Sequence, residues 1–121
     1  MTGGASNRQR GDYLERQAKA ALGDLGWIMI RAAGSHGIMD LVALRAGNTP
    51  LLVSCKTNGR IGPGERVALC EAAALAGARP VMACRRKRGW IALLVVRPDG
   101  FRDLDSIRVP RRVADPGDVP S

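Results

Sequence analysis

The chain has 121 residues, of which 45% are hydrophobic and 3% aromatic, so we expect one domain with a mostly aliphatic core. The formal net charge of +8 favours an anionic partner, either nucleic acid or an anionic membrane surface. Nucleic acid is the stronger candidate because the basic residues cluster. No apolar run approaches the ~18 residues that a membrane-spanning helix needs, and residues 1–10 are polar, unlike a signal peptide.

The cysteines indicate the redox compartment. Cys55, Cys70 and Cys84 are odd in number and too widely spaced for a CxxC site. We interpret them as small buried hydrophobic residues in a reducing environment, which predicts a cytoplasmic protein.

The N-terminal part of the chain predicts an arm and a helix. Residues 1–10 are rich in Gly, Ser, Asn and Arg, which predicts a disordered basic arm. A helix is expected from Gly11 or Asp12 up to Gly26, with Asp12 as N-cap and Glu15 as its capping-box partner. The apolar residues at helical spacing predict its buried face: Leu14, Ala18, Ala21, Leu22 and Leu25. Glu15 borders this face, so it either caps the helix or projects towards the sheet as a metal ligand.

A strand and a loop of small residues follow the helix. Trp27 to Arg31 is a predicted strand, and residues 32–37 form a loop that a phosphate backbone could approach closely. Ser35 could hydrogen-bond a phosphate oxygen or stabilise the turn. His36 is the only histidine, and we interpret it as a surface residue without a catalytic role.

The stretch from 38 to 56 predicts a β-hairpin with polar residues inside its apolar strands. Its strands are 38–45 and 50–56, and turn-forming residues separate them. A carboxylate within a strand is costly unless it is paired, which singles out Asp40, and Ser54 and Lys56 share one face of their strand. A loop with an odd number of residues, such as 46–48, or a β-bulge would place Asp40 on that same face.

The second half of the chain predicts a helix at 63–75, strands at 80–84 and 90–96, and a polar tail at 99–121. Between the two strands lies a basic turn of four cations: Arg85, Arg86, Lys87 and Arg88. Such a turn is either a solvated hairpin tip or a contact to DNA phosphates. We favour the DNA contact because phosphates would relieve the mutual repulsion of adjacent cations.

This order of elements predicts an α/β sandwich with a mixed sheet. From Gly11 to Val96 the chain resembles the PD-(D/E)xK nuclease superfamily, and within it the archaeal Holliday junction resolvases and their phage relatives. The matching residues are Glu15-Arg16 on the first helix, Arg31, Ser35, Asp40 in an apolar strand, and Ser54-Cys55-Lys56 in the acid-x-Lys slot. The resemblance implies a restriction-endonuclease-like fold over residues 11–98, with a five-stranded mixed β-sheet flanked by helices.

The resemblance also implies a metal-dependent DNA endonuclease. Glu15, Asp40 and the backbone carbonyl of Cys55 would hold one or two Mg²⁺ ions, with Mn²⁺ as an alternative. Lys56 would orient the nucleophile or stabilise the pentacovalent phosphate, so the implied catalytic set is Glu15, Asp40, Ser54 and Lys56. The implied DNA contacts are Arg16, Arg31, Ser35, Arg60 and the basic turn 85–88. A four-way junction has two symmetric strands to cut, which a homodimer matches, so we expect a homodimer on branched DNA, near a nucleoid or in a host cytoplasm.

The chain departs from the family pattern at Ser54, where the family usually has Glu or Asp. A neutral hydroxyl is a weaker ligand for a hard cation than a carboxylate, and Glu65 or Glu71 are candidates to replace the charge. Asp40 and Lys56 could instead form a buried ion pair without chemistry. Three functions therefore stay open: a junction resolvase, another nuclease of this fold acting on ends, flaps or nicked duplex, and a DNA-binding module without activity.

Overall fold

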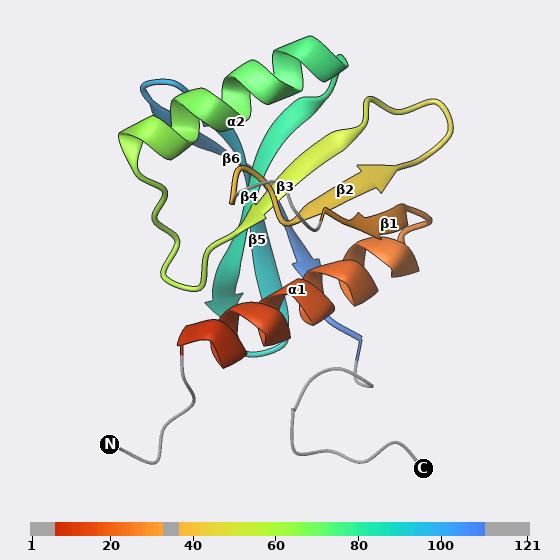
Figure 1. Cartoon of the computed structure of the whole chain (residues 1–121). Coiled ribbons are helices and arrows are strands. Elements are labelled where there is room, and N and C mark those ends of the chain that lie inside the picture. The colour runs from red at the N-terminus through yellow and green to blue at the C-terminus, as the bar shows by residue number, and fades with distance from the viewer. Residues whose placement is uncertain (1–6, 33–36, 111–121) are drawn as a thin grey trace.

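The computed structural model describes residues 7–32 and 37–110 and shows a six-stranded sheet with a helix on each face (Figure 1). The strands lie in sequence order, and all neighbours are antiparallel except β3 and β4. Their bounds are β1 Ile28–Arg31, β2 Leu41–Leu44, β3 Leu51–Cys55, β4 Arg79–Lys87, β5 Trp90–Arg97 and β6 Gly100–Arg108. Helix α2, Pro63–Ala76, connects the two parallel strands, as such a crossover requires. No helix within the described ranges is long and apolar enough to cross a membrane.

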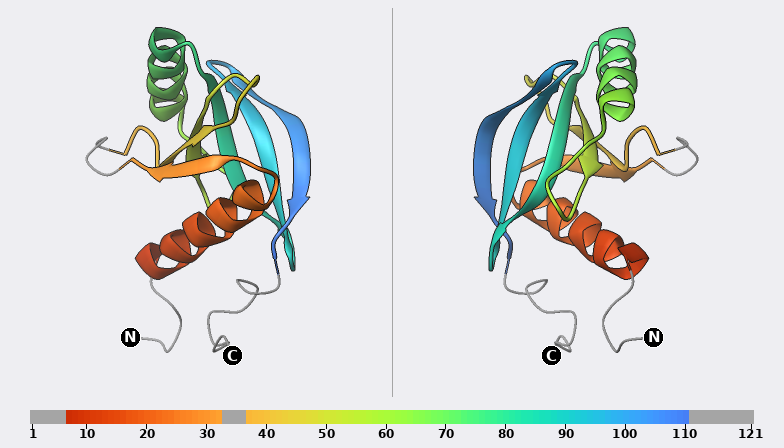
Figure 2. Two further views of the ribbon diagram at one scale, coloured as in Figure 1. Left: turned by 90° about the vertical axis from the view of Figure 1, so that its right-hand side faces the viewer. Right: turned by 90° about the vertical axis from the view of Figure 1, so that its left-hand side faces the viewer.

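The two helices cover opposite faces of the sheet because the strand side chains alternate. Under α1, Asn7–Asp24, the core contains strand residues at alternate positions, among them Leu41, Val53 and Ala83. Under α2 it contains the residues between them, such as Leu52 and Met82. Figure 2 shows α1 and α2 on either side of β1 and β2. The predicted α/β sandwich is confirmed.

Helix α1 begins earlier than its sequence predicted. It starts at Asn7, so residues 7–10 are helical rather than part of a disordered arm, and residues 1–6 lie outside the described residues. Asp12 is therefore inside the helix, and the prediction that Asp12 and Glu15 form an N-terminal capping box is wrong. The predicted buried face is present at Leu14, Ala18, Ala21 and Leu22, but Leu25 lies beyond the helix end and is 51% exposed.

The hairpin has the register that the proposed site requires. Leu41 lies opposite Val53 and Ala43 opposite Leu51, and at the end of this ladder the Asp40 N–H also donates to the Val53 carbonyl. The connecting loop therefore has odd parity, as predicted. Because side chains alternate along a strand and Val53 and Cys55 belong to the core under α1, Ser54 belongs to the face that α2 covers. Lys56, directly after β3, contacts α2 through Glu65, and Asp40 directly precedes β2.

The C-terminal part of the domain contains a strand that the sequence did not predict. Residues 100–108, assigned to a polar tail, form edge strand β6, so the sheet has six strands rather than five. Strand β4 also continues through Lys87, so most of the predicted basic turn is strand, and only Arg88 and Gly89 form the reversal. The part of the predicted tail at 111–121 lies outside the described residues.

Candidate active site

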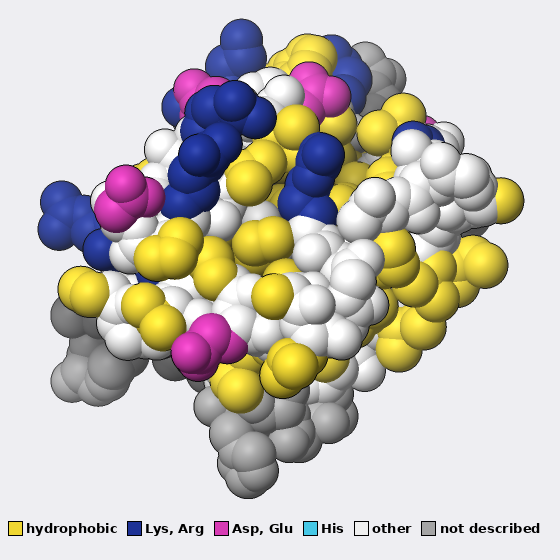
Figure 3. All heavy atoms as spheres, turned by 90° about the horizontal axis from the view of Figure 1, so that it is seen from above, with side chains coloured by type: hydrophobic (Ala, Val, Ile, Leu, Met, Phe, Trp, Pro, Cys, Tyr) yellow, Lys and Arg dark blue, Asp and Glu magenta, His cyan; other side chains and the backbone are white. Residues whose placement is uncertain are grey.

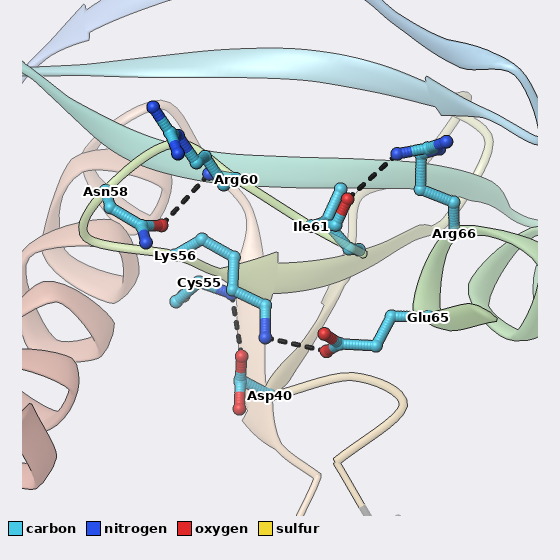
Figure 4. A network of polar contacts seen from close by, with 8 residues as sticks. All are labelled: Asp40, Cys55, Lys56, Asn58, Arg60, Ile61, Glu65 and Arg66. Carbon is cyan, nitrogen blue, oxygen red and sulfur yellow. Dashed lines mark hydrogen bonds and ion pairs between the residues drawn. The ribbon is translucent and has the colours of Figure 1, made fainter. Parts of the chain in front are cut away.

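The carboxylate of Asp40 is fixed at the end of the hairpin. Its backbone N–H donates to the Val53 carbonyl (2.8 Å), and its carbonyl accepts from the Ala32 N–H (2.9 Å). Its Oδ2 accepts the N–H of Cys55 at 2.7 Å (Figure 4). Cys55 is the last residue of β3, so the carboxylate serves as the acceptor for a backbone N–H at the end of the strand. Asp40 is thus positioned by three hydrogen bonds.

Glu15 reaches the same end of the sheet from α1. Its side chain is 17% exposed, and its Oε1 lies 3.5 Å from Nε of Arg31. Burial raises the pKa of Glu15, the negative charge of Asp40 raises it further, and the Arg31 guanidinium partly offsets both. Glu15 therefore faces the sheet, and the negative charge of Asp40 acts on its carboxylate. A cation near both carboxylates would relieve this repulsion.

Cys55 contributes its backbone rather than its thiol. Its side chain packs against the core under α1, and burial raises the pKa of the thiol well above its usual value, with Asp40 and Glu15 adding to the effect. The thiol is consequently neutral and a poor metal ligand. In an extended strand the N–H and C=O of one residue point to the same side, so the Cys55 carbonyl points to the side where Asp40 lies.

Lys56 is paired with a residue from the second helix. Its Nζ lies 2.7 Å from Oε2 of Glu65, in the first turn of α2 (Figure 4). The alternative of an ion pair between Lys56 and Asp40 is therefore not what the structure contains. Ser54, in the slot of the expected acid, is 1% exposed. Of the two candidates for the missing charge, Glu65 lies beside Lys56, whereas Glu71 is exposed farther along α2.

The basic end of β4 lies at the same end of the sheet as Lys56, because β3 and β4 are parallel and Cys55 pairs with Ala83. There the guanidinium of Arg85 lies 5.3 Å from the centre of the Tyr13 ring, and that of Arg16 lies 5.6 Å from it. Tyr13 is 7% exposed and thus holds one arginine of α1 and one of β4 together. This role of Tyr13 is not predictable from the sequence, because an aromatic residue near a helix start usually only packs.

The other predicted DNA contacts vary in their surroundings. Arg86 pairs with Asp103 of β6 at 3.2 Å, so one of the four cations already has an acidic partner. Lys87 lies 5.7 Å from the centre of the Trp90 ring. Arg60 and Arg88 are exposed. Ser35 and His36 lie outside the described residues.

The donor set suits a hard cation. Within residues 7–32 and 37–110, no three His, Cys, Asp or Glu side chains gather in a way that could hold a metal ion. Two carboxylates and a main-chain carbonyl nevertheless fit Mg²⁺, which commonly binds through one or two carboxylates and keeps several waters.

Comparison with known proteins identifies the family. The family model described as "Archaeal holliday junction resolvase (hjc)" matches residues 6–115, nearly the whole chain. The chain belongs to this resolvase family. The structure of Hjc from Archaeoglobus fulgidus, a Holliday junction resolvase from an archaeal hyperthermophile, shares the fold, with a TM-score of 0.60, 23% sequence identity and 87% of each chain covered. No curated protein sequence gave a match.

The family defines the activity: this resolvase is a nuclease that acts on Holliday junctions, and the resemblance found in the sequence is confirmed. Family membership also makes the resolvase a metal-dependent nuclease, without specifying the metal. In this resolvase the predicted residues Glu15, Asp40, Cys55 and Lys56 lie at one end of the sheet: Asp40 bonds to the N–H of Cys55, the neighbour of Lys56, and Glu15 pairs with Arg31 opposite Leu41. Glu65, which the sequence left as one of two alternatives, joins them.

Proposed function

We propose that the protein cleaves four-way DNA junctions as an Mg²⁺-dependent endonuclease, with its active site around Asp40. The observation that supports this most directly is the grouping of Glu15, Asp40 and Lys56. Asp40 accepts the N–H of Cys55, the residue before Lys56, at 2.7 Å. Glu15 pairs with Arg31, which lies opposite Leu41, the residue after Asp40. Two carboxylates beside an ammonium suit a cation and a scissile phosphate.

Each residue of this group has a proposed role. Glu15, Asp40 and the Cys55 carbonyl would hold the metal, which when bound supplies an activated water and neutralises charge on the leaving oxygen. Lys56 carries a positive charge to the phosphate, where it orients the reacting groups or stabilises the added negative charge. Ser54 is buried and neutral, so we propose that it contributes little. Arg31 pairs with Glu15 in the structure. A flanking phosphate of bound DNA would compete with Glu15 for the Arg31 guanidinium.

Cleavage assays on matched substrates test this function. With millimolar Mg²⁺ we expect cleavage of a mobile-core four-way junction, little or no cleavage of linear duplexes made from its arms, and no cleavage with chelator. Flap and nicked duplexes of the same sequence serve as further substrates. Preferential cutting of flaps or nicks would favour another nuclease activity of this fold. No cleavage with Mg²⁺ or Mn²⁺, despite junction binding, would favour a DNA-binding module without activity.

We further propose that the resolvase works as a homodimer. From composition alone, the apolar strand 90–96 and the Ala-rich face of the helix 63–75 are candidate contacts. In the structure, however, β5 lies inside the sheet between β4 and β6, and Ala72 of α2 packs against the core. Exposed apolar residues lie instead on β1 and β2: Ile28 (65% exposed), Ile30 (45%) and Leu44 (37%). Ile28 is paired with Leu44, so all three share one face of the sheet. Figure 3 shows hydrophobic side chains gathered on that side of the molecule.

Sedimentation checks the dimer. We expect the protein to sediment as a dimer at micromolar concentration, and Ile30→Asp to shift it to monomer, because a carboxylate cannot be buried unpaired in an apolar interface. Leu104→Asp, on edge strand β6 at the far side of the sheet, is the matched control and should remain dimeric. A protein that stays monomeric both free and with junction DNA would contradict this proposal.

A further inference from the structure

The Lys56–Glu65 pair joins the proposed active site to helix α2. The two side chains come from different elements, and their charged atoms are 2.7 Å apart. An exposed ion pair of this kind usually contributes little to stability, so stability alone gives no reason for its presence. The position of the pair gives a reason for its presence. Lys56 lies two residues after Ser54, which supplies no charge, and Glu65 lies on the same side of β3 as Asp40 (Figure 4).

We infer that Glu65 is a positioning residue that replaces, from α2, the carboxylate missing at Ser54, and that it acts through Lys56. This rests on the proposed active site around Asp40. An ammonium without a partner beside Asp40 would pair with that carboxylate and compete with a metal ion for it. Glu65 instead holds the ammonium, which leaves the Asp40 carboxylate available to the metal and keeps Lys56 at the site.

Hydrogen bonds hold the segment between Lys56 and Glu65 in one conformation, and with it the ion pair. The Gly59 N–H donates to the Lys56 carbonyl (3.0 Å), and the Arg60 N–H donates to Oδ1 of Asn58 (3.0 Å). Nη1 of Arg66 donates to the carbonyl of Ile61 at 2.9 Å, and Ile61 itself is 4% exposed. These bonds fix the path from β3 to α2, and with it the approach of Glu65 to Lys56.

The start of the helix also favours a charged Glu65. Glu65 is the third residue of α2, after Pro63 and Gly64, and the N-terminus of a helix carries partial positive charge. A carboxylate is therefore stabilised at this position whether or not Lys56 is beside it. Glu71 lies farther along the same helix, outside this first turn, and it is the natural control.

Four variants test the inference: Glu65→Gln, Glu65→Asp, Glu71→Gln and the double variant Ser54→Asp/Glu65→Gln. Under single-turnover conditions with saturating enzyme, we expect Glu65→Gln to lower the cleavage rate about 10- to 100-fold, as loss of residues that orient active-site groups typically does. Junction affinity measured with chelator should stay at the parent value. Glu65→Asp should cleave faster than Glu65→Gln, and Glu71→Gln should match the parent.

Metal binding gives a readout that does not depend on cleavage. Titration of the DNA-free protein with Mn²⁺, followed by electron paramagnetic resonance, should show weaker binding for Glu65→Gln than for the parent, because Lys56 is then released towards Asp40. The folded double variant should recover the Mn²⁺ affinity and the cleavage rate of the parent, because Ser54→Asp places a carboxylate on the strand itself.

Several results would overturn the inference. These are a Glu65→Gln variant with the parent rate and Mn²⁺ affinity, one that cleaves faster than the parent, and a folded double variant as slow as Glu65→Gln. Lys56→Ala separates this failure from failure of the proposed site. If Lys56→Ala loses cleavage while Glu65→Gln keeps it, only the role of Glu65 is wrong. If Lys56→Ala also cleaves like the parent, the proposed active site is wrong as well.

Discussion

Asp40→Asn should lower junction cleavage about a thousandfold, the upper range for removing one charged or polar group from a preorganised active site. The change removes a negative charge from the group of side chains proposed to hold the metal. It leaves the local fold intact, because the amide oxygen of asparagine can still accept the Cys55 N–H that Asp40 Oδ2 accepts now. The measurement is the single-turnover rate on a labelled four-way junction with Mg²⁺.

Junction binding and thermal unfolding serve as controls for this variant. Both should match the parent, since contacts from cations to phosphates supply most of the affinity and Asp40 is not one of them. Asp99→Asn, an exposed carboxylate in the β5–β6 turn, is the matched substitution elsewhere and should leave the rate unchanged. An Asp40→Asn variant that cuts junctions at the parent rate would show that the active site lies elsewhere.

The second large effect is expected from neutralising the basic end of β4. Replacing Arg85, Lys87 and Arg88 with glutamine should weaken junction binding at least tenfold and lower the slope of log affinity against log salt by about 2.7 units, at about 0.9 for each of three phosphate contacts. Arg86 is left unchanged because it already pairs with Asp103. Binding is measured by fluorescence anisotropy over a series of salt concentrations.

A matched triple variant makes the test specific to position. Arg79 of β4, Arg97 of β5 and Arg102 of β6 are exposed at the opposite end of the sheet from Arg85–Arg88. Their replacement by glutamine removes the same number of positive charges. That variant should keep most of the affinity and most of the salt slope. Equal losses from the two triple variants would mean that net charge alone attracts the DNA, without a preferred end of the sheet.

The hairpin illustrates what could be predicted from the sequence. The positions of the apolar and polar residues, together with the need to bring Asp40 to the face of Lys56, required a loop of odd parity, and the register has it. Strand β6 could not be predicted, because its burial does not alternate: only Ile107 of its residues is buried, and a register shift at Leu93 and Leu94 interrupts the pairing with β5. An edge strand with charged side chains has the composition of a tail.

The candidate site was predictable only in part, for a similar reason. Asp40 directly precedes the periodic strand β2 and Lys56 directly follows β3, so counting residues along the hairpin brings them to the same end of it. Glu65 reaches Lys56 through an irregular loop, whose path depends on hydrogen bonds such as that from Arg66 to Ile61. The contact of Arg16 and Arg85 with one Tyr13 ring joins elements far apart in the chain, and no local pattern encodes it.

The single parallel pairing has a consequence for how the chain folds. On each side of it, β1 to β3 and β4 to β6 are antiparallel meanders, which close through short connections at small entropic cost. Joining β3 to β4 instead closes a loop that contains the whole of α2, a long-range contact of the kind that slows folding. Asp40 and Lys56 belong to the first meander and the basic end of β4 to the second. The proposed cleavage centre and its DNA anchor therefore become one surface only when this last, least local pairing has formed.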